Sequence, residues 1–296
     1  MKTFRTLLSA LLIGCFLVPA LARAQSPASA TSAAALKKLN WELSVAAYSF
    51  RNYTFFETLD KLKELGVDKV EGFNFQRISA DIPTALNPAV MTDVQIQAVK
   101  KKLSETGVQL VALYYGGFPN EEAACRRIFA RSKELGVRWF ISEPALDTLP
   151  LLDKLGTEYG IAVGLHGHDK KSSPNTWHPE LVLKQCAPYS KTIGAFSDTG
   201  HWQRSELDPA EGARILKDRL VGTEIHDLHE FNPSGHDVPL GEGVGKMKQF
   251  LTEIAKGNQR TILISVEYVS NPDNPSSDVQ KCLDFIHSTA IELAKE

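Results

Sequence analysis

Four sequence segments place an acidic or histidine side chain directly after an apolar run typical of a buried strand. They are "FISEP" with Glu143, "GAFSDTGHW" with Asp198, "GTEIHDLHE" with His226 and "ISVEY" with Glu267. Three carboxylates gathered in one cavity would repel one another strongly unless a cation lay between them. Carboxylate oxygens with one imidazole suit Mn²⁺, Mg²⁺ or Co²⁺ better than a metal that prefers thiolates. These four residues are therefore candidate ligands for one divalent metal ion.

Other side chains at the ends of predicted strands are candidates for contact with a substrate. His166 and His168 in "GLHGH" are two residues apart, so they lie on the same side of an extended chain. A single Glu at a strand end is more often a solvated rim residue, and a single His is more often a packing residue, so the interpretation depends on several of them meeting. The candidate substrate-binding residues are Tyr48, Glu71, His166, His168, His201 and Trp202.

A recurring phrase indicates how these strands are separated along the chain. Glu, one residue, Gly and then Val or Ile occurs in "KELGVDKVEGF", "SETGVQLVALYY", "KELGVRWFISEP" and "TEYGIAVGLHGH". Gly just beyond a helix favours the left-handed conformation that ends the helix. The β-branched residue that follows favours the start of a strand. The phrase therefore predicts four helix-to-strand junctions.

Eight strands, each followed by a helix, are predicted from the whole chain. Their expected ranges are 42–48, 68–73, 108–114, 137–143, 161–167, 192–198, 220–226 and 261–267. Eight alternating units predict a (β/α)8 TIM barrel, in which the carboxyl ends of the strands share one mouth. An open doubly wound sheet is the alternative, but no G-x-G-x-x-G follows the first strand.

The first 24 residues are typical of a secretory signal peptide. Lys2 and Arg5 precede an apolar segment over residues 7–21, and a small-x-small cleavage site ends at Ala24. Lipoprotein anchoring at Cys15 is the alternative, and we favour cleavage after Ala24. We expect a periplasmic or secreted protein.

The apolar segment is too short for a membrane span, so none is expected. Residues 25–40 are rich in Ala and Ser, which predicts a flexible N-terminal segment. The remaining residues, 41–296, are expected to form one domain.

The composition limits the partners of the protein. Loss of residues 1–24 changes the formal charge from −2 to −5, and no basic stripe suits a nucleic acid. An odd number of cysteines then remains, which argues against a disulfide framework in an exported protein. We expect Cys125, Cys186 and Cys282 to be apolar packing residues. The oligomeric state stays open, with a homo-oligomer as one option.

The motifs at the strand ends resemble those of the xylose isomerase-like TIM barrels, the sugar phosphate isomerase/epimerase superfamily. The resemblance runs from about Trp41 to the C-terminus. It rests on Glu143 after strand 4, "HGHD" after strand 5, "DTGH" after strand 6, "IHDLHE" at strand 7, "PLGEG" in the next loop and "SVEY" at strand 8.

The resemblance implies roles for several residues. Glu143, Asp198, His226 and Glu267 would bind one divalent metal, Glu143 and Glu267 would be the paired acid and base, and His201 would bind substrate oxygens. The sequence departs from the family's common His-x-Lys-Asp pattern after His226, which puts the substrate contacts on that side in doubt. Gly167 also replaces the Asn that more often separates the two histidines of strand 5.

The resemblance implies a metal-dependent sugar isomerase or epimerase that removes a proton next to a carbonyl. Export and the lack of an Arg-rich or Gly-rich phosphate cradle favour a free sugar or glycoside as substrate. The same site would also support elimination or hydration of a 3-keto-glycoside. A phosphodiesterase similar to endonuclease IV and a non-catalytic sugar-binding barrel are further alternatives. The negative charge disfavours the phosphodiesterase, which would need a basic groove.

Overall fold

A closed parallel barrel forms the centre of the computed structural model, which describes residues 27–257 and 260–295. The strands pair in the order β1-β10-β7-β6-β5-β4-β3-β2. They are β1 (Trp41–Ala46), β2 (Lys69–Phe73), β3 (Gln109–Tyr114), β4 (Trp139–Ser142), β5 (Ala162–Leu165), β6 (Ile193–Asp198), β7 (Leu220–Ile225) and β10 (Ile262–Val266). All of them fall within the predicted ranges or extend one residue beyond, and the (β/α)8 TIM barrel is confirmed.

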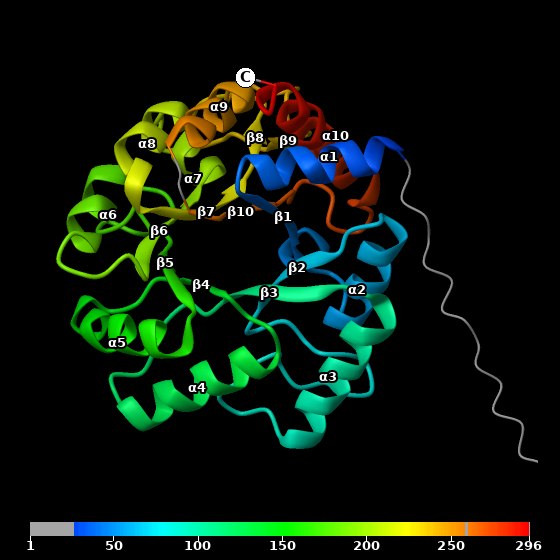
Figure 1. The fold of residues 1–296 in the computed structure, drawn as a ribbon, viewed down its shortest axis with the longest axis vertical. Helices are drawn as coiled ribbons and strands as arrows, with labels where there is room; N and C mark the ends of the chain where they lie inside the picture. Colours follow the sequence, from blue (N-terminus) through cyan, green and yellow to red (C-terminus); the bar gives the residue numbers. More distant parts are fainter. Residues whose placement is uncertain (1–26, 258–259, 296) are drawn as a thin grey trace, which may run out of the picture.

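Helices surround the strands as an outer ring (Figure 1). They are α1 (Pro27–Lys38), α2 (Phe55–Glu64), α3 (Asp93–Thr106), α4 (Glu122–Glu134), α5 (Leu149–Tyr159), α6 (Pro179–Cys186), α7 (Thr199–Arg204), α8 (Pro209–Leu216), α9 (Met247–Gly257) and α10 (Ser276–Leu293). Short 3-10 helices are η1 (Ala47–Phe50), η2 (Leu146–Thr148) and η3 (Lys217–Arg219). A small antiparallel pair, β8 (Asp227–Leu228) and β9 (Asp237–Val238), follows β7.

The recurring Glu-x-Gly-Val/Ile phrase ends four helices as expected. Gly66, Gly107, Gly136 and Gly160 have φ values of 73°, 73°, 98° and 68°. These angles lie in the left-handed region, which a residue with a Cβ adopts only at a cost. The glycines therefore allow the chain to leave each helix and enter the next strand.

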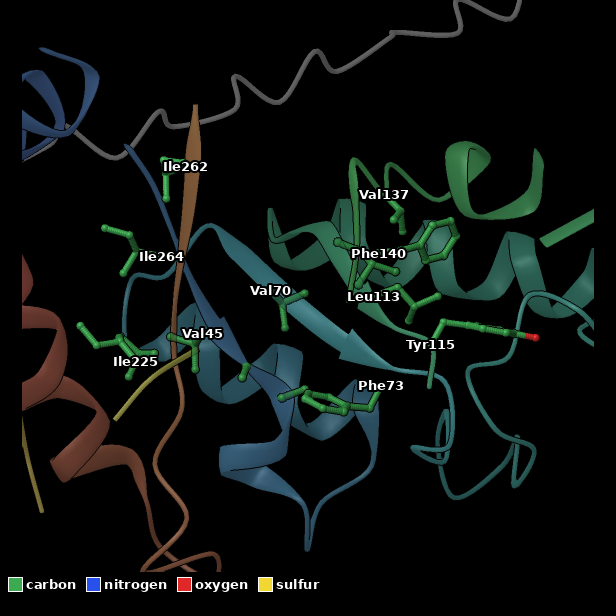
Figure 2. Packing of buried hydrophobic residues seen from close by; sticks show 14 of the residues in the cluster. Val45, Val70, Phe73, Leu113, Tyr115, Val137, Phe140, Ile225, Ile262 and Ile264 are labelled. Carbon is green, nitrogen blue, oxygen red and sulfur yellow. The ribbon is translucent and has the colours of Figure 1, made fainter. Parts of the chain in front are cut away.

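Side chains on the barrel strands alternate between two hydrophobic clusters. Ile262 and Ile264 of β10 belong to the large cluster that also contains helix residues, and Figure 2 shows them on the same side of their strand. Leu263, between them, belongs to a second cluster formed by strand residues, with Trp139 and Phe196. This alternation fills both the barrel interior and the space beneath the helices, as expected for a packed TIM barrel.

The hydrophobic interior gives way to polar side chains toward the carboxyl ends of the strands. On β6, Phe196 is part of the interior cluster, and Asp198, two residues later, ends the strand and is also buried. Because residues two apart on a strand face the same side, Asp198 lies above Phe196 in the barrel. The barrel thus supplies a rigid apolar base for a polar mouth.

The expectation of a flexible segment over residues 25–40 is wrong for its described part, because residues 27–38 form α1. Ala is the strongest helix former, which explains why this Ala-rich stretch folds as a helix. Ala35 is buried, and Lys38 donates a hydrogen bond to the backbone oxygen of Ala294 after α10. The predicted signal peptide, residues 1–24, lies outside the described residues.

Two further expectations concern the helices and the cysteines. Among the described residues, no helix combines the length and apolar character needed to cross a membrane. Cys125, Cys186 and Cys282 are free and buried, as expected for packing residues.

Candidate active site

The carboxyl ends of five barrel strands bring acidic and imidazole side chains to one mouth. Asp198 ends β6, while Glu143, His166, His226 and Glu267 directly follow β4, β5, β7 and β10. These strands are neighbours in the barrel, so their ends lie side by side. The strand order therefore places these residues at the same end of the barrel, as the sequence predicted.

His226 is oriented as a metal-binding imidazole would be. Its Nδ1 lies 2.8 Å from Oδ2 of Asp237, while its buried Nε2 has no hydrogen-bond partner. This Nε2 lies 3.6 Å from Oδ2 of Asp198 and 4.0 Å from Oε1 of Glu267. A carboxylate on the far ring nitrogen is the usual device that orients a histidine toward a metal. The donor set of Asp198, His226 and Glu267 therefore fits a divalent cation.

Burial and neighbouring charges perturb this group strongly. Burial alone would lower the pKa of His226, but Asp237 and Asp198 raise that pKa to about 10. Burial raises the pKa of Glu267 well above its ordinary value, and the carboxylate of Glu224 raises it further. Without a cation, His226 and Glu267 thus hold protons where a metal ion would bind. Metal binding would have to displace those protons.

Glu143 is held by several donors at the edge of this group. Its Oε1 accepts a hydrogen bond from the hydroxyl of Tyr114 at 2.8 Å and lies 3.0 Å from Nδ1 of His168. Its Oε2 accepts from the hydroxyl of Ser173 at 3.0 Å. Burial alone would raise the pKa of Glu143, but His166 and His168 hold it well below the usual range. Glu143 is therefore an oriented, ionised carboxylate.

His166 connects Glu143 to the buried carboxylates of the barrel. Its Nδ1 lies 3.4 Å from Oε1 of Glu143, and its Nε2 lies 2.8 Å from Oε2 of Glu224 and 3.8 Å from Oδ2 of Asp198. Among the described residues, three groups have potential ligand atoms within 4.8 Å of one another. They are Glu143, His166 and His168; His166, Asp198 and Glu224; and Glu71, Glu224 and Glu267.

The predicted four-ligand set is thus divided in this structure. Nε2 of His226 lies within 4.0 Å of Asp198 and of Glu267, whereas Glu143 belongs to the adjoining group and reaches Asp198 through His166. His166, predicted to contact substrate, is almost fully buried and serves here as the link.

His201 and His168 face the mouth as a pair, with ring centroids 4.6 Å apart. The backbone N–H of His201 donates to Oδ1 of Asp198 at 2.8 Å, so the carboxylate caps α7 as well as facing the mouth. Nε2 of His201 lies 3.7 Å from Oδ2 of Asp198. Burial lowers the pKa of His201 to about 4. A neutral imidazole in this position can hydrogen-bond to substrate hydroxyl groups.

A group of aromatic side chains adjoins Glu143 through Tyr114. Four rings form a continuous group that we call the aromatic wall, and the neighbouring ring centroids are 5.4–6.2 Å apart. They belong to Tyr48 of η1, Phe73 at the end of β2, Phe75 just after β2 and Tyr114 at the end of β3. Phe75 is 57% exposed, which is unusual for so large an apolar side chain. An exposed aromatic face beside polar groups is suited to stacking on a ligand. Tyr48, a predicted substrate contact, belongs to this wall.

The expected contact between Trp202 and a substrate is not supported by its position. Trp202 is 4% exposed and packs in the hydrophobic core, with its ring centroid 6.5 Å from that of Phe250 in α9. Gly212 of α8 leaves room for the indole, because a Cβ there would lie 2.5 Å from the ring. One residue along a helix turns a side chain by about 100°, so Trp202 faces away from its neighbour His201.

Glu71 lies below the mouth rather than at its surface. It is fully buried in the middle of β2, and neither of its carboxylate oxygens has a hydrogen-bond partner. Burial raises the pKa of Glu71 well above its ordinary value, and the charge of Glu224 raises it further. A direct contact with substrate, as predicted from its place on the strand, would require access that this position does not offer.

Asp227, at the variable position of the His-x-Lys-Asp pattern, holds the loop that follows β9. Its carboxylate accepts three backbone hydrogen bonds, from Gly241 at 2.9 Å, Gly243 at 3.1 Å and Gly245 at 2.9 Å. It thereby anchors the "PLGEG" loop beside the mouth.

Three residues of the site were missed by the sequence interpretation. Tyr114 ends β3, so the strand-end criterion that found Glu143 could have found it. Ser173 and Asp237 lie in connections beyond β5 and β7, where no spacing in the sequence predicts that they return to the mouth. Asp237 is brought back to His226 by the pairing of β8 with β9.

Solved structures of other proteins share this fold. An uncharacterised protein from Parabacteroides distasonis is 25% identical, with a TM-score of 0.66 over 84% of this chain and 99% of that one. A xylose isomerase-like TIM barrel protein from Mycobacterium smegmatis, solved in complex with magnesium, is 14% identical, with a TM-score of 0.67 over 87% and 99% of the two chains. An L-ribulose 3-epimerase is 15% identical, with a TM-score of 0.64 over 86% and 95%.

No protein-family model matches the sequence, and the comparison with curated proteins gives no match. The structural similarities show that the chain has the TIM-barrel fold of these xylose isomerase-like proteins.

Proposed function

We propose that the protein is an exported, divalent-metal-dependent isomerase or epimerase that moves a proton next to a carbonyl of a free sugar or glycoside. The observation that carries this proposal is the orientation of His226. Its Nδ1 is tied to Asp237, and its unpartnered Nε2 faces Asp198 and Glu267, with the ionised Glu143 in the adjoining group. The proposed metal ligands are Glu143, Asp198, His226 and Glu267.

The paired carboxylates divide the proton transfer between them. Mn²⁺, Mg²⁺ or Co²⁺ bound by this set would polarise the substrate carbonyl, stabilise the negative charge left by proton removal and lower the pKa of Glu267. Glu143 is the proposed base, because its carboxylate is ionised and its side chain is 25% exposed at the mouth. Glu267 is the proposed second carboxylate of the pair, which returns a proton to the carbon; a metal that lowers its raised pKa would bring that pKa closer to the range useful for proton transfer.

The face that receives the proton decides the product. Return of the proton to the opposite face of the same carbon inverts that carbon, and return to the neighbouring carbon isomerises the sugar. His168 and His201 are proposed to bind substrate hydroxyl groups, and the aromatic wall is proposed to stack on the apolar face of the ring. His166 and Glu71 are proposed to act through the groups that they touch.

Two similar proteins support the class of reaction and the need for a metal. One is an L-ribulose 3-epimerase, and the protein from Mycobacterium smegmatis was solved with magnesium. The proposal of a non-phosphorylated substrate depends on export, for which the signal-peptide pattern of residues 1–24 is the basis. N-terminal sequencing of the protein from the periplasm or medium tests export, and a mature chain that starts at Gln25 is expected.

A lyase or hydratase for 3-keto-glycosides is the second candidate. It uses the same base, but the carbon next to the deprotonated one loses a substituent. The exposed Phe75 and the neighbouring Tyr48 favour this candidate, because they offer space for a second ring or an aglycone beside Glu143. A product that lacks the leaving group separates this reaction from epimerisation.

The test is solvent deuterium exchange followed by ¹H NMR. Purified protein loaded with Mn²⁺ is incubated in D₂O with free ketoses and 3-keto-glycosides, and deuterium is expected next to the carbonyl of one of them. Glu143→Gln should reduce the rate at least 100-fold, while Glu230→Gln, on the exposed loop after β7, should leave it unchanged. A protein that binds these sugars but exchanges no proton would instead be a non-catalytic sugar-binding barrel.

A further inference from the structure

Three buried carboxylates meet inside the barrel below the proposed metal ligands. Glu71 on β2 is 0% exposed, Glu224 on β7 is 2% exposed and Glu267 after β10 is 9% exposed. Each offers an oxygen within 4.8 Å of the others. Carboxylates so close together in a dry interior require compensation by protons or by a cation.

Protein groups compensate only part of this charge. Nε2 of His166 lies 2.8 Å from Oε2 of Glu224. Among the described residues, no Lys or Arg forms an ion pair with any of the three carboxylates, although such pairs are frequent on the surface. Both oxygens of Glu71 lack a hydrogen-bond partner. The carboxylate of Glu71 is therefore the least satisfied group of the cluster.

A neutral donor on the neighbouring strand is unsatisfied at the same level. Ser265 is fully buried, and its hydroxyl oxygen has no hydrogen-bond partner. The strand register places Ser265 beside Glu224 of β7 on one side and beside Ser44 of β1 on the other. Ser265 lies close enough to Glu71 to influence its carboxyl group. The hydroxyl oxygen of Ser265 and the oxygens of the three carboxylates form an oxygen-only donor set, in which Glu71 and Ser265 have no hydrogen-bond partner.

We propose that Glu71, Glu224, Glu267 and Ser265 bind a second divalent cation, Mg²⁺ or Mn²⁺, below the first, with Glu267 shared between the two ions. Oxygen ligands of these ions lie about 2.0–2.2 Å from the metal, so two ligands of one ion are at most about 4–4.5 Å apart. The separations within the cluster are of this order. The donor set contains no nitrogen or sulfur, which favours these hard cations.

The second ion would act on the proposed reaction through Glu267. A cation beneath Glu267 would lower the pKa of its carboxyl group further, and ions of such a two-metal site lie about 3.5–4 Å apart. The inference rests on the proposed metal site for this shared ligand, but not on the proposed proton transfer.

Manganese titration of the metal-free protein tests the proposal. Isothermal titration calorimetry with Mn²⁺ should give two ions per chain, and electron paramagnetic resonance should show the exchange-coupled spectrum of two neighbouring Mn²⁺ ions. Glu71→Gln, which keeps the shape but removes the charge, should leave one ion with an uncoupled six-line spectrum. The surface variant Glu230→Gln should keep two coupled ions.

One ion per chain in the unmodified protein, or two coupled ions in Glu71→Gln, would overturn the proposal. If Glu71→Gln does not fold, the same Mn²⁺ titration of Ser265→Ala tests the second site. This substitution removes one neutral ligand and should weaken the second ion about tenfold without changing the first, whereas unchanged affinity for both ions would contradict the assignment. One ion with active deuterium exchange would refute this inference alone, and two coupled ions without exchange would refute the proposed reaction alone.

Discussion

Replacing Asp237 with Asn perturbs the orientation of His226 without touching the proposed metal ligands. Oδ2 of Asp237 lies 2.8 Å from Nδ1 of His226, its Oδ1 accepts from Nη2 of Arg204 at 3.0 Å, and the backbone N–H of Val269 donates to Oδ2 at 2.9 Å. Asn keeps the volume and one acceptor oxygen but loses the charge. His226 then loses the anionic partner that keeps its proton on Nδ1 and leaves Nε2 free for a metal.

The expected magnitude follows from this contact. Loss of the partner of a metal-binding histidine typically costs 10- to 100-fold in metal affinity, so Asp237→Asn should raise the Kd for Mn²⁺ by about that factor. The substitution also breaks the ion pair between Asp237, whose side chain is 1% exposed, and Arg204. Removing one partner of such a pair costs about 3–5 kcal/mol of folding free energy.

Arg204→Lys separates these two effects. It disturbs the ion pair but leaves the contact between Asp237 and His226 in place. We expect this control to lower the unfolding temperature of the metal-free protein while the Kd for Mn²⁺ stays within about twofold of the original. Calorimetric titration with Mn²⁺ and thermal unfolding followed by circular dichroism measure both quantities. Unchanged Mn²⁺ affinity in a folded Asp237→Asn protein would refute the proposed role of His226.

Three further predictions concern the base, the protons at the metal site and the aromatic wall. Tyr114→Phe removes the hydroxyl donor 2.8 Å from Glu143, so the kinetic pKa of Glu143 should rise and kcat should fall about tenfold, corresponding to about 1.5 kcal/mol; a pH–rate profile identical to the original would contradict this. The pKa of His226 is raised to about 10 in the ion-free protein, so at pH 6–8 its proton must leave before a metal binds. Mn²⁺ affinity should therefore rise with pH by up to about tenfold per pH unit for this proton, and further for the proton of Glu267; an affinity independent of pH in calorimetry would contradict it. Phe75→Ala removes an exposed stacking face and should raise KM about tenfold for the sugar or glycoside with little effect on kcat, whereas an unchanged KM would exclude stacking there.

The barrel was predictable because its signals are local. Gly66, Gly107, Gly136 and Gly160 are needed wherever a helix ends in the left-handed conformation, and each is followed within a few residues by a strand. Local chain geometry alone requires this pattern. The end of each strand could then be located, and with it the residues at the mouth.

Most of the candidate site followed from the same reasoning, since the barrel gathers the ends of its strands. Glu71 shows where this reasoning fails, because Glu71 lies two residues before the end of β2 and not at the end. At about 3.3 Å per residue this places it about 7 Å deeper, among the buried carboxylates rather than at the mouth. The sequence indicated the correct strand but not the level within the barrel.

The remaining failures depend on contacts that local sequence does not encode. The orientation of Trp202 is set by α7, whose existence within a strand-to-helix connection was not anticipated. Asp237 reaches His226 only because the chain turns back through the short pair of β8 and β9. Residues 27–38 form a helix that packs against α10, near the opposite end of the chain.

Anomalous diffraction from crystals grown with Mn²⁺ tests the central claim most directly. The account predicts a manganese peak about 2.0–2.3 Å from Nε2 of His226 and in contact with carboxylate oxygens of Asp198 and Glu267. A peak in another place, or no peak at saturating Mn²⁺ in protein that is correctly folded, would contradict the proposal that these side chains gather around a common cation.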